Sequence, residues 1–230
     1  MTKIFLSLTH FFGLTRPMLK LVVRFHNACR HLAGALASRL ESGGLHPKHR
    51  ITKYHEWFVE RMEPGWTVLD VGCGNGALTA DIADAVGGEG RVVAVDLNAD
   101  NIAAARGGCS AENVEYVVGD ATLDVPEVVP DAVVLSNVLE HIERRVDFLR
   151  GLPRKKGTLF LLRVPLVDRD WLVFLKREIG VEWRLDKTHF VEYTEEELRS
   201  ELEGAGLSVE EPRRRFGEFY CVSRVVERGR

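Results

Sequence analysis

The chain has 230 residues, of which 45% are hydrophobic and 28% charged, and its formal net charge is -3. These values describe an ordinary globular protein and exclude a disordered or fibrous chain, while the slight acidity disfavours a surface that is basic throughout and binds nucleic acid. The length suits one domain with an extension. The four cysteines lie far apart without a CxxC pair, so we expect neither a zinc site nor a disulfide framework, and a reducing cytoplasm is the expected setting.

The first 40 residues differ in charge from the rest of the chain, because they contain six Lys or Arg residues and no Asp or Glu. The apolar residues between these cations predict an amphipathic helix that packs on the domain or covers the active site, and peripheral contact with an anionic membrane is the alternative. Thr9 and His10 interrupt the apolar run after Lys3, so neither a signal peptide nor a transmembrane helix is expected. We assign residues 1–50 to this basic helical extension.

From residue 51 onward the hydrophobic periodicity alternates between helix and strand, after a helix expected over 51–62. The strands are expected at 66–71, 91–95, 114–118, 131–136 and 158–164, and the helices between them at 77–86, 98–107 and 142–150. A capped helix at 194–206 and two further strands at 207–211 and 219–226 complete the pattern. It predicts an α/β domain over 51–230, with a Rossmann-like, seven-stranded, mostly parallel sheet covered by helices on both faces.

The string "VLDVGCGNGALT" at residues 68–79 places three glycines where the first strand turns into the first helix. Ligands of an open parallel sheet bind at the carboxyl ends of the strands. Glycines there let a ligand approach the backbone, and the amides of the helix N-terminus face it. The string alone is ambiguous, because it also satisfies the G-x-G-x-x-A pattern of dinucleotide-binding proteins.

Polar residues after the next strands separate these alternatives. Asp96 ends the second strand, where a carboxylate can accept hydrogen bonds from both ribose hydroxyls of any adenosine cofactor. Asp120 ends the third strand, where a dehydrogenase needs no carboxylate but an adenine amino group could donate to one. Ser136 and Asn137 end the fourth strand at the same edge of the sheet.

In this order and spacing, the four landmarks resemble the class I S-adenosylmethionine-dependent methyltransferases over about residues 50–226. The resemblance implies S-adenosylmethionine as cofactor. Asp70 would then orient the loop or the methionine amino group, Asp96 would hold the ribose, and Asn137 would lie below the methyl group. Cys73 would be a small filler of the loop rather than a nucleophile. The implied cofactor-binding residues are Asp70, Gly72, Cys73, Gly74, Asp96, Leu97, Asp120, Ala121 and Asn137.

Methyl transfer from a sulfonium is an in-line displacement, so the protein mainly has to align the nucleophile and exclude water. A hydroxyl acceptor also benefits from a general base, and His141 and His189 are the candidates near neutral pH. Some small-RNA 2′-O-methyltransferases and quinone-biosynthesis methyltransferases carry an E-x-x-E-H metal motif in this region. Here Asn137 replaces the first glutamate and weakens the site that Glu140 and both histidines could form, so no metal is expected.

The acceptor is less well defined by the sequence. An insertion at 165–190 carries Trp171, Phe174 and Trp183 among basic residues, and it is either a substrate-side lid or a helix packed on the domain. We predict methyl transfer to a small-molecule or lipid-linked acceptor, at oxygen rather than nitrogen or carbon. The alternatives are a nucleic-acid methyltransferase, an NAD-dependent oxidoreductase, and a non-catalytic membrane-associated protein that keeps the cofactor fold.

Overall fold

A computed structural model describes residues 3, 7, 10, 13–40, 46–109 and 111–226. The chain divides into two compact units. One consists of Met1–Ile51 together with Asp170–Lys187, and the other of Thr52–Arg169 together with Thr188–Arg230.

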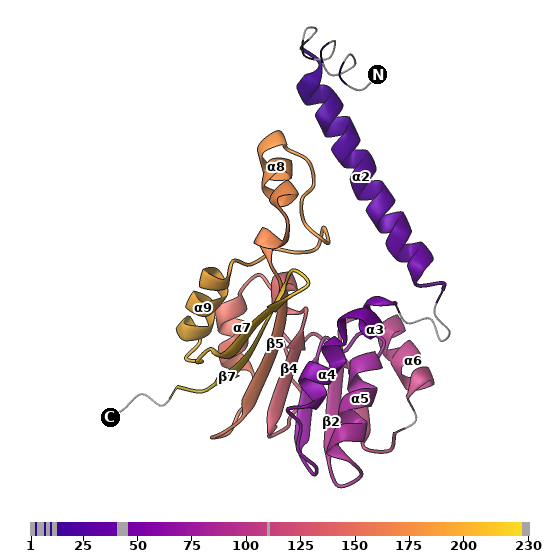
Figure 1. Ribbon diagram of the computed structural model, residues 1–230. Helices are drawn as coiled ribbons and strands as arrows, with labels where there is room; N and C mark the ends of the chain where they lie inside the picture. Colours follow the sequence, from indigo (N-terminus) through magenta and orange to yellow (C-terminus); the bar gives the residue numbers. More distant parts are fainter. Residues whose placement is uncertain are drawn as a thin grey trace. The chain divides into compact units, whose positions relative to one another are not determined.

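The larger unit contains a seven-stranded sheet with the strand order β3-β2-β1-β4-β5-β7-β6 (Figure 1). The first five strands of this order pair in parallel, whereas β7 is antiparallel to both β5 and β6. This confirms the predicted seven-stranded, mostly parallel α/β fold. The strands are β1 (Thr67–Val71), β2 (Arg91–Asp96), β3 (Val114–Val118), β4 (Ala132–Ser136), β5 (Leu159–Pro165), β6 (Glu210–Arg215) and β7 (Glu218–Arg224).

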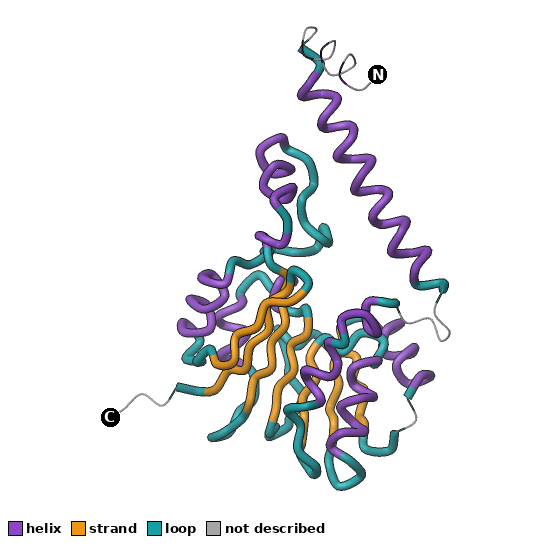
Figure 2. The backbone as a smooth tube through the Cα atoms, viewed as in Figure 1, coloured by secondary structure: helices purple, strands orange, loops and turns teal. Residues whose placement is uncertain are grey.

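Helices cover both faces of this sheet (Figure 2). Side chains alternate along a strand, so Val68 of β1 joins the core under one set of helices while Leu69 joins the core under the other. The first set is α4 (Tyr54–Val59), α5 (Ala77–Val86) and α6 (Ala99–Gly108), and the second is α7 (Arg145–Gly151) and α9 (Glu195–Gly204). Burial on both faces explains why the central strands are continuous apolar runs in the sequence.

Two predicted elements differ from the structure. The helix expected over 51–62 is split into α3 (Lys48–Thr52) and α4, because Lys53 between them has the left-handed φ of 51°. The strand expected at 207–211 lies instead at Glu210–Arg215, which is an exposed edge strand. An edge strand can be charged throughout, so its sequence EEPRRR gave no apolar periodicity from which to place it.

The smaller unit contains α2 (Thr15–Ala37), α8 (Trp171–Ile179) and the segment that follows α8. Its core is small and consists of Val23, Ile179 and Val181, with Leu19 and Leu175 packed against them. Asn27 Nδ2 also donates a hydrogen bond to the Glu182 carbonyl at 2.8 Å, which fixes the middle of α2 to that segment. No helix among the described residues is long and apolar enough to cross a membrane.

Candidate active site

The glycine loop begins directly after β1 and is held by the end of β2. The N–H groups of Gly72 and Cys73 both donate to the Val95 carbonyl, at 2.7 and 3.1 Å. Gly74 then donates its N–H to Asp96 Oδ2 at 2.8 Å. The loop is therefore fixed by backbone hydrogen bonds to the neighbouring strand before any ligand binds.

The three glycines of this loop have positive φ angles but different surroundings. A Cβ on Gly72 would lie 2.7 Å from the Val138 side chain, and one on Gly76 would lie 2.7 Å from Ala105 Cβ. A Cβ on Gly74 would have no atom within 4 Å. Gly72 and Gly76 are therefore required by packing inside the protein, whereas the space beside Gly74 is open to a ligand.

Asp70 lies at the buried end of β1 and ties the strand to α5. Thr79 Oγ1 donates a hydrogen bond to Asp70 Oδ2 at 2.7 Å. Burial is the main cause that raises the pKa of Asp70 to about 7; the Thr79 hydrogen bond opposes this shift and the nearby Asp96 carboxylate adds to it. The role of Asp70 in orienting the loop stays a prediction.

This buried carboxyl predicts a specific dependence of stability on pH. Between about 4, the ordinary pKa of an aspartate, and about 7, the folded chain keeps a proton that the unfolded chain has lost. The free energy of unfolding should therefore fall as pH rises through this window, by up to about 1.4 kcal/mol per pH unit for one proton. Urea unfolding at pH 5 and pH 7 measures this slope, and Asp70→Asn should make it shallower. An unchanged slope in the variant would show that Asp70 titrates normally in the folded protein.

Asp96 connects the glycine loop to the start of α6. Besides the bond from Gly74, its Oδ1 accepts hydrogen bonds from the Asn98 N–H at 2.9 Å and from Asn101 Nδ2 at 3.1 Å. A carboxylate offers about four acceptor positions, so these three bonds leave capacity for a ribose hydroxyl. Leu97, predicted beside it in the cofactor site, has an exposed side chain.

Asp120 lies two residues beyond the end of β3, whose bounds are those predicted. Its Oδ1 accepts hydrogen bonds from the Thr122 N–H at 2.9 Å and the Thr122 hydroxyl at 2.6 Å. These bonds hold the pKa of Asp120 below its usual value. Asp120 therefore stabilises the turn that contains Ala121. Both bonds are accepted by Oδ1, so Oδ2 takes part in neither of them.

Asn137 follows β4 in a conformation that is uncommon for a residue with a side chain. Its φ is 60°, its N–H donates to the Arg163 carbonyl at 2.8 Å, and its Nδ2 donates to Glu140 Oε1 at 2.9 Å. Such backbone strain concentrates at functional sites. Glu140 is fully buried, and its Oε2 has no hydrogen-bond partner among the described residues. Burial raises the pKa of Glu140 to about 7.

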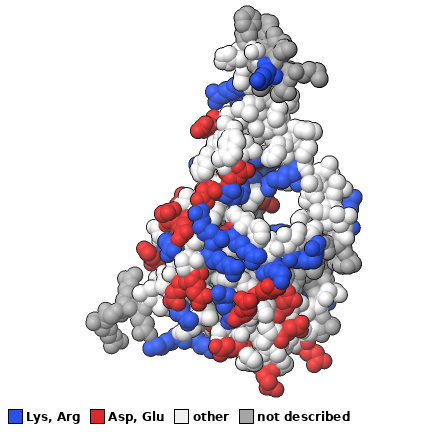
Figure 3. All heavy atoms as spheres, in the orientation of Figure 1, with Lys and Arg blue, Asp and Glu red and all other residues white. Residues whose placement is uncertain are grey.

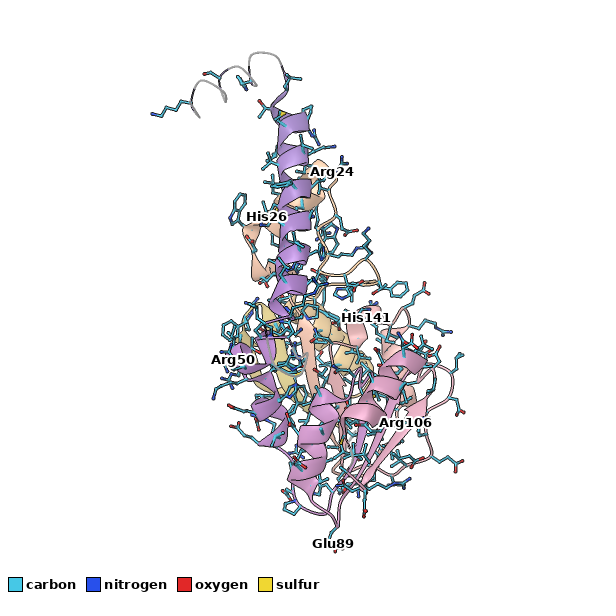
Figure 4. All side chains as sticks on the ribbon, turned by 90° about the vertical axis from the view of Figure 1, so that its right-hand side faces the viewer. Arg24, His26, Arg50, Glu89, Arg106 and His141 are labelled. Atoms are coloured by element: carbon cyan, nitrogen blue, oxygen red, sulfur yellow. The ribbon has the colours of Figure 1, made fainter. Side chains whose placement is uncertain are left out.

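The structure brings His141 and His189 together, although they are distant in the sequence. Their rings meet edge to face, with centroids 4.6 Å apart. His141 Nδ1 lies 2.9 Å from the Thr188 hydroxyl, and His189 Nδ1 lies 3.2 Å from Glu192 Oε1. His141 lies at the edge of the sheet where β4 ends, in the view of Figure 4.

Glu140, His141 and His189 also form the donor set that could hold a metal. One ligand atom from each lies within 4.8 Å of the others, and Glu140 Oε2 would gain a partner. A carboxylate and two imidazoles suit zinc or another transition metal, and binding would require the loss of the Glu140 proton. The expectation that this protein uses no metal remains a prediction.

The site also contains residues outside the predicted cofactor-binding and catalytic sets. Glu192 is fully buried and binds both His189 and the Arg169 guanidinium, so it holds the histidine in place. Its position three residues after His189 was the only signal in the sequence. Arg163 gave none, because it lies within an apolar strand. Its guanidinium is 3.7 Å from the centre of the Tyr54 ring, and it pairs with Glu218 beside the end of β4.

A separate cavity of about 620 Å³ lies between the 121–125 loop and α7. Ala121 is its only residue from the predicted cofactor set, and no glycine of the loop lines it. This cavity is therefore distinct from the open space beside Gly74.

An open α/β sheet with this strand order, a glycine loop after β1 and a carboxylate after β2 defines a nucleotide-cofactor fold. Residues 68–154 match the family model described as a methyltransferase domain. Residues 68–154 are therefore a methyltransferase domain, and the fold of the larger unit is that of the class I S-adenosylmethionine-dependent methyltransferases.

Among sequence relatives, the ribosomal protein L11 methyltransferase of Burkholderia mallei (strain NCTC 10229) is 35% identical over 115 residues, which cover 46% of this chain. The chain spans about a third of that relative's length, because the match covers 35% of it. Among solved structures, a methyltransferase from Aquifex aeolicus described as SAM-dependent has a TM-score of 0.60 at 19% identity, covering 84% of this chain and 98% of its own. An O-methyltransferase from neocarzinostatin biosynthesis, in complex with S-adenosylhomocysteine and 1,4-dihydroxy-2-naphthoic acid, has a TM-score of 0.57 at 18% identity, with coverages of 79% and 57%. At these identities the structural matches establish the shared fold.

Proposed function

We propose that this protein binds S-adenosylmethionine and transfers its methyl group to an oxygen atom of a small-molecule or lipid-linked acceptor. The observation that carries the proposal is the joint placement of two features at the carboxyl edge of the sheet. One is the Asp96 carboxylate bonded to the open Gly74 loop, and the other is the His141–His189 pair next to Asn137.

The residues of the loop fit the cofactor. The open side of Gly74 admits the methionine portion close to the backbone, and Asp96 retains acceptor capacity for ribose hydroxyls. Asp70 would counter the methionine ammonium in its deprotonated form. We also propose contacts to the ribose, adenine and methyl ends of the cofactor from four further residues, which are Leu97, Asp120, Ala121 and Asn137.

The cofactor supplies an activated methyl group, and the protein supplies alignment and a proton acceptor. As the acceptor oxygen attacks the methyl carbon, the carbon–sulfur bond breaks and the acceptor proton passes to a histidine. Glu192 accepts from His189 Nδ1–H and thereby selects the tautomer whose Nε2 carries the lone pair. The Thr188 hydroxyl lies 2.9 Å from His141 Nδ1 and orients that ring, but it selects no tautomer because a hydroxyl can both donate and accept.

Removing these bases should slow the chemical step without loosening the cofactor. We expect His141→Gln or His189→Gln to lower kcat by about 10²–10⁴-fold, the usual contribution of a general base, with unchanged affinity for S-adenosylhomocysteine. The measurement is transfer of labelled methyl from S-adenosylmethionine across pH 5.5–9. Glu192→Gln, which keeps the size of the side chain but removes the charge that faces His189 and Arg169, should lower kcat less. Full activity in both histidine variants would contradict the role of the pair.

Metal dependence is tested in the same assay. Under the histidine-base mechanism, dialysis against EDTA leaves the rate unchanged. A rate that is lost with EDTA and restored by a divalent cation would instead assign Glu140, His141 and His189 to a metal site.

The acceptor class can be resolved by a screen with labelled cofactor. The neocarzinostatin O-methyltransferase supports a phenolic or hydroxyl acceptor, whereas the similarity to L11 methyltransferases supports a ribosomal protein as the second candidate. The screen therefore needs hydroxylated aromatics, lipid-linked hydroxyls, ribosomal protein and RNA as separate arms. Label in the protein or RNA arm alone would contradict a small-molecule or lipid-linked acceptor. Cofactor binding without transfer to any arm would favour the non-catalytic alternative.

A lipid-linked acceptor would be reached through peripheral contact between residues 1–40 and a membrane surface. The excess of basic residues and the absence of acidic ones in this segment support that contact.

A further inference from the structure

Helix α2 presents two different apolar faces. One face packs within its own unit, where Val23 is buried against α8 and the segment after it. The other face consists of Leu14, Leu21, Phe25, Leu32 and Leu36, and all five side chains are between 48% and 70% exposed. We call these five residues the apolar stripe. Their spacing of seven and four residues places them on one side of a helix.

The stripe is too large to be scattered surface hydrophobics. It runs from the residue before α2 almost to its end at Ala37, and no described residue of its own unit buries it. Nearby α8 adds two more exposed aromatic residues, Trp171 at 73% and Phe174 at 44%. A continuous apolar face of this kind marks an interaction surface.

The charged residues of α2 indicate which kind of partner covers the apolar stripe. At helical spacing Arg24 lies beside the stripe and Lys20 further round the same side, whereas Arg16 and Arg30 lie on the opposite face; no acidic residue occurs within residues 1–40. Figure 3 shows the visible surface of α2 as mainly white with isolated blue atoms. A second copy of α2 would bring these like charges together without a carboxylate on either helix to pair with them. An anionic bilayer satisfies both features, because its acyl chains accept the apolar residues and its headgroups accept the cations.

We propose that the apolar stripe of α2 lies in the headgroup–acyl boundary of an anionic phospholipid membrane, with Arg24 and Lys20 beside it on the lipid phosphates. This proposal concerns membrane binding and does not depend on methyl transfer.

Vesicle cosedimentation of the full chain tests the proposal. We expect at least about tenfold stronger partitioning onto phosphatidylcholine vesicles containing 30% phosphatidylglycerol than onto pure phosphatidylcholine, declining with added salt. The double variant Phe25→Gln/Leu32→Gln should lose at least about tenfold in partitioning, because two exposed apolar side chains no longer enter the lipid.

The matched control changes two exposed histidines outside the stripe, His26→Gln/His31→Gln, and should partition as the wild type does. Arg24 and His26 project from different sides of α2 (Figure 4). S-adenosylhomocysteine binding and circular dichroism of every variant show that the fold is intact. Equal partitioning of the stripe variant and the control would overturn the proposal. So would a wild-type dimer in sedimentation equilibrium that the stripe variant dissociates without any vesicle binding, which would assign the stripe to a second copy.

Discussion

Replacing Asp96 with alanine is expected to weaken S-adenosylhomocysteine binding by roughly 10–100-fold, since hydrogen bonds to a charged group contribute about 1.5–3 kcal/mol. The substitution removes the proposed acceptor for the ribose hydroxyls. It also removes the bond that fixes the Gly74 N–H at 2.8 Å, so the loop would lose its anchor to β2. Titration calorimetry of the wild type and the variant measures this loss.

Two control variants separate a specific effect from a general one. Asp100→Ala removes a carboxylate from the first turn of α6, outside the proposed site, and should bind as the wild type does. Asp96→Asn keeps the size and one acceptor oxygen, and should give an intermediate affinity. If Asp96→Ala bound as tightly as the wild type, Asp96 would have only a structural role in the loop.

Gly76→Ala is expected to lower the free energy of unfolding by roughly 2–5 kcal/mol. The residue has a φ of 77°, and a left-handed conformation costs a residue with a side chain about 1–2 kcal/mol. The new Cβ would also lie 2.7 Å from Ala105 Cβ and 2.8 Å from the Tyr116 hydroxyl, and overpacking a tight core costs about 1–3 kcal/mol. Urea unfolding measures the change.

Gly74→Ala provides the matched comparison in the same loop. Its φ of 57° brings a strain of about 1–2 kcal/mol, but its Cβ would have no protein atom within 4 Å. We therefore expect a smaller loss of stability than in Gly76→Ala and a larger loss of cofactor affinity, because the methyl group would occupy the open side of the loop. Equal losses of stability in the two variants would contradict the difference in packing.

The sheet was predictable because the residues that mark each buried strand lie next to one another in the sequence. Buried parallel strands are continuous apolar runs, and a strand-end carboxylate such as Asp96 interrupts the run where the strand stops. Both ends of the helix at Ala77–Val86 were predicted correctly, because Gly76 precedes its first residue and Gly87 follows its last. The charged edge strand β6 was misplaced, since exposure removes the periodicity on which such predictions depend.

The site was predictable only in part, because its remaining contacts join distant segments. His141 and His189 were each candidates, but no spacing in the sequence shows that their rings meet. The buried Glu192–Arg169 pair behind His189, and Arg163 stacked on Tyr54, depend on tertiary packing alone. Asp120 was predicted as a ligand for adenine, and the structure adds a role in its own turn through Thr122.

Titration calorimetry of the wild-type protein with S-adenosylhomocysteine, beside NADH, tests the central claim most directly. Binding at a 1:1 ratio with micromolar affinity, and none for NADH, is the result expected for the Gly74–Asp96 site. A folded protein that binds NADH, or that binds neither ligand, would contradict the assignment of this site to S-adenosylmethionine.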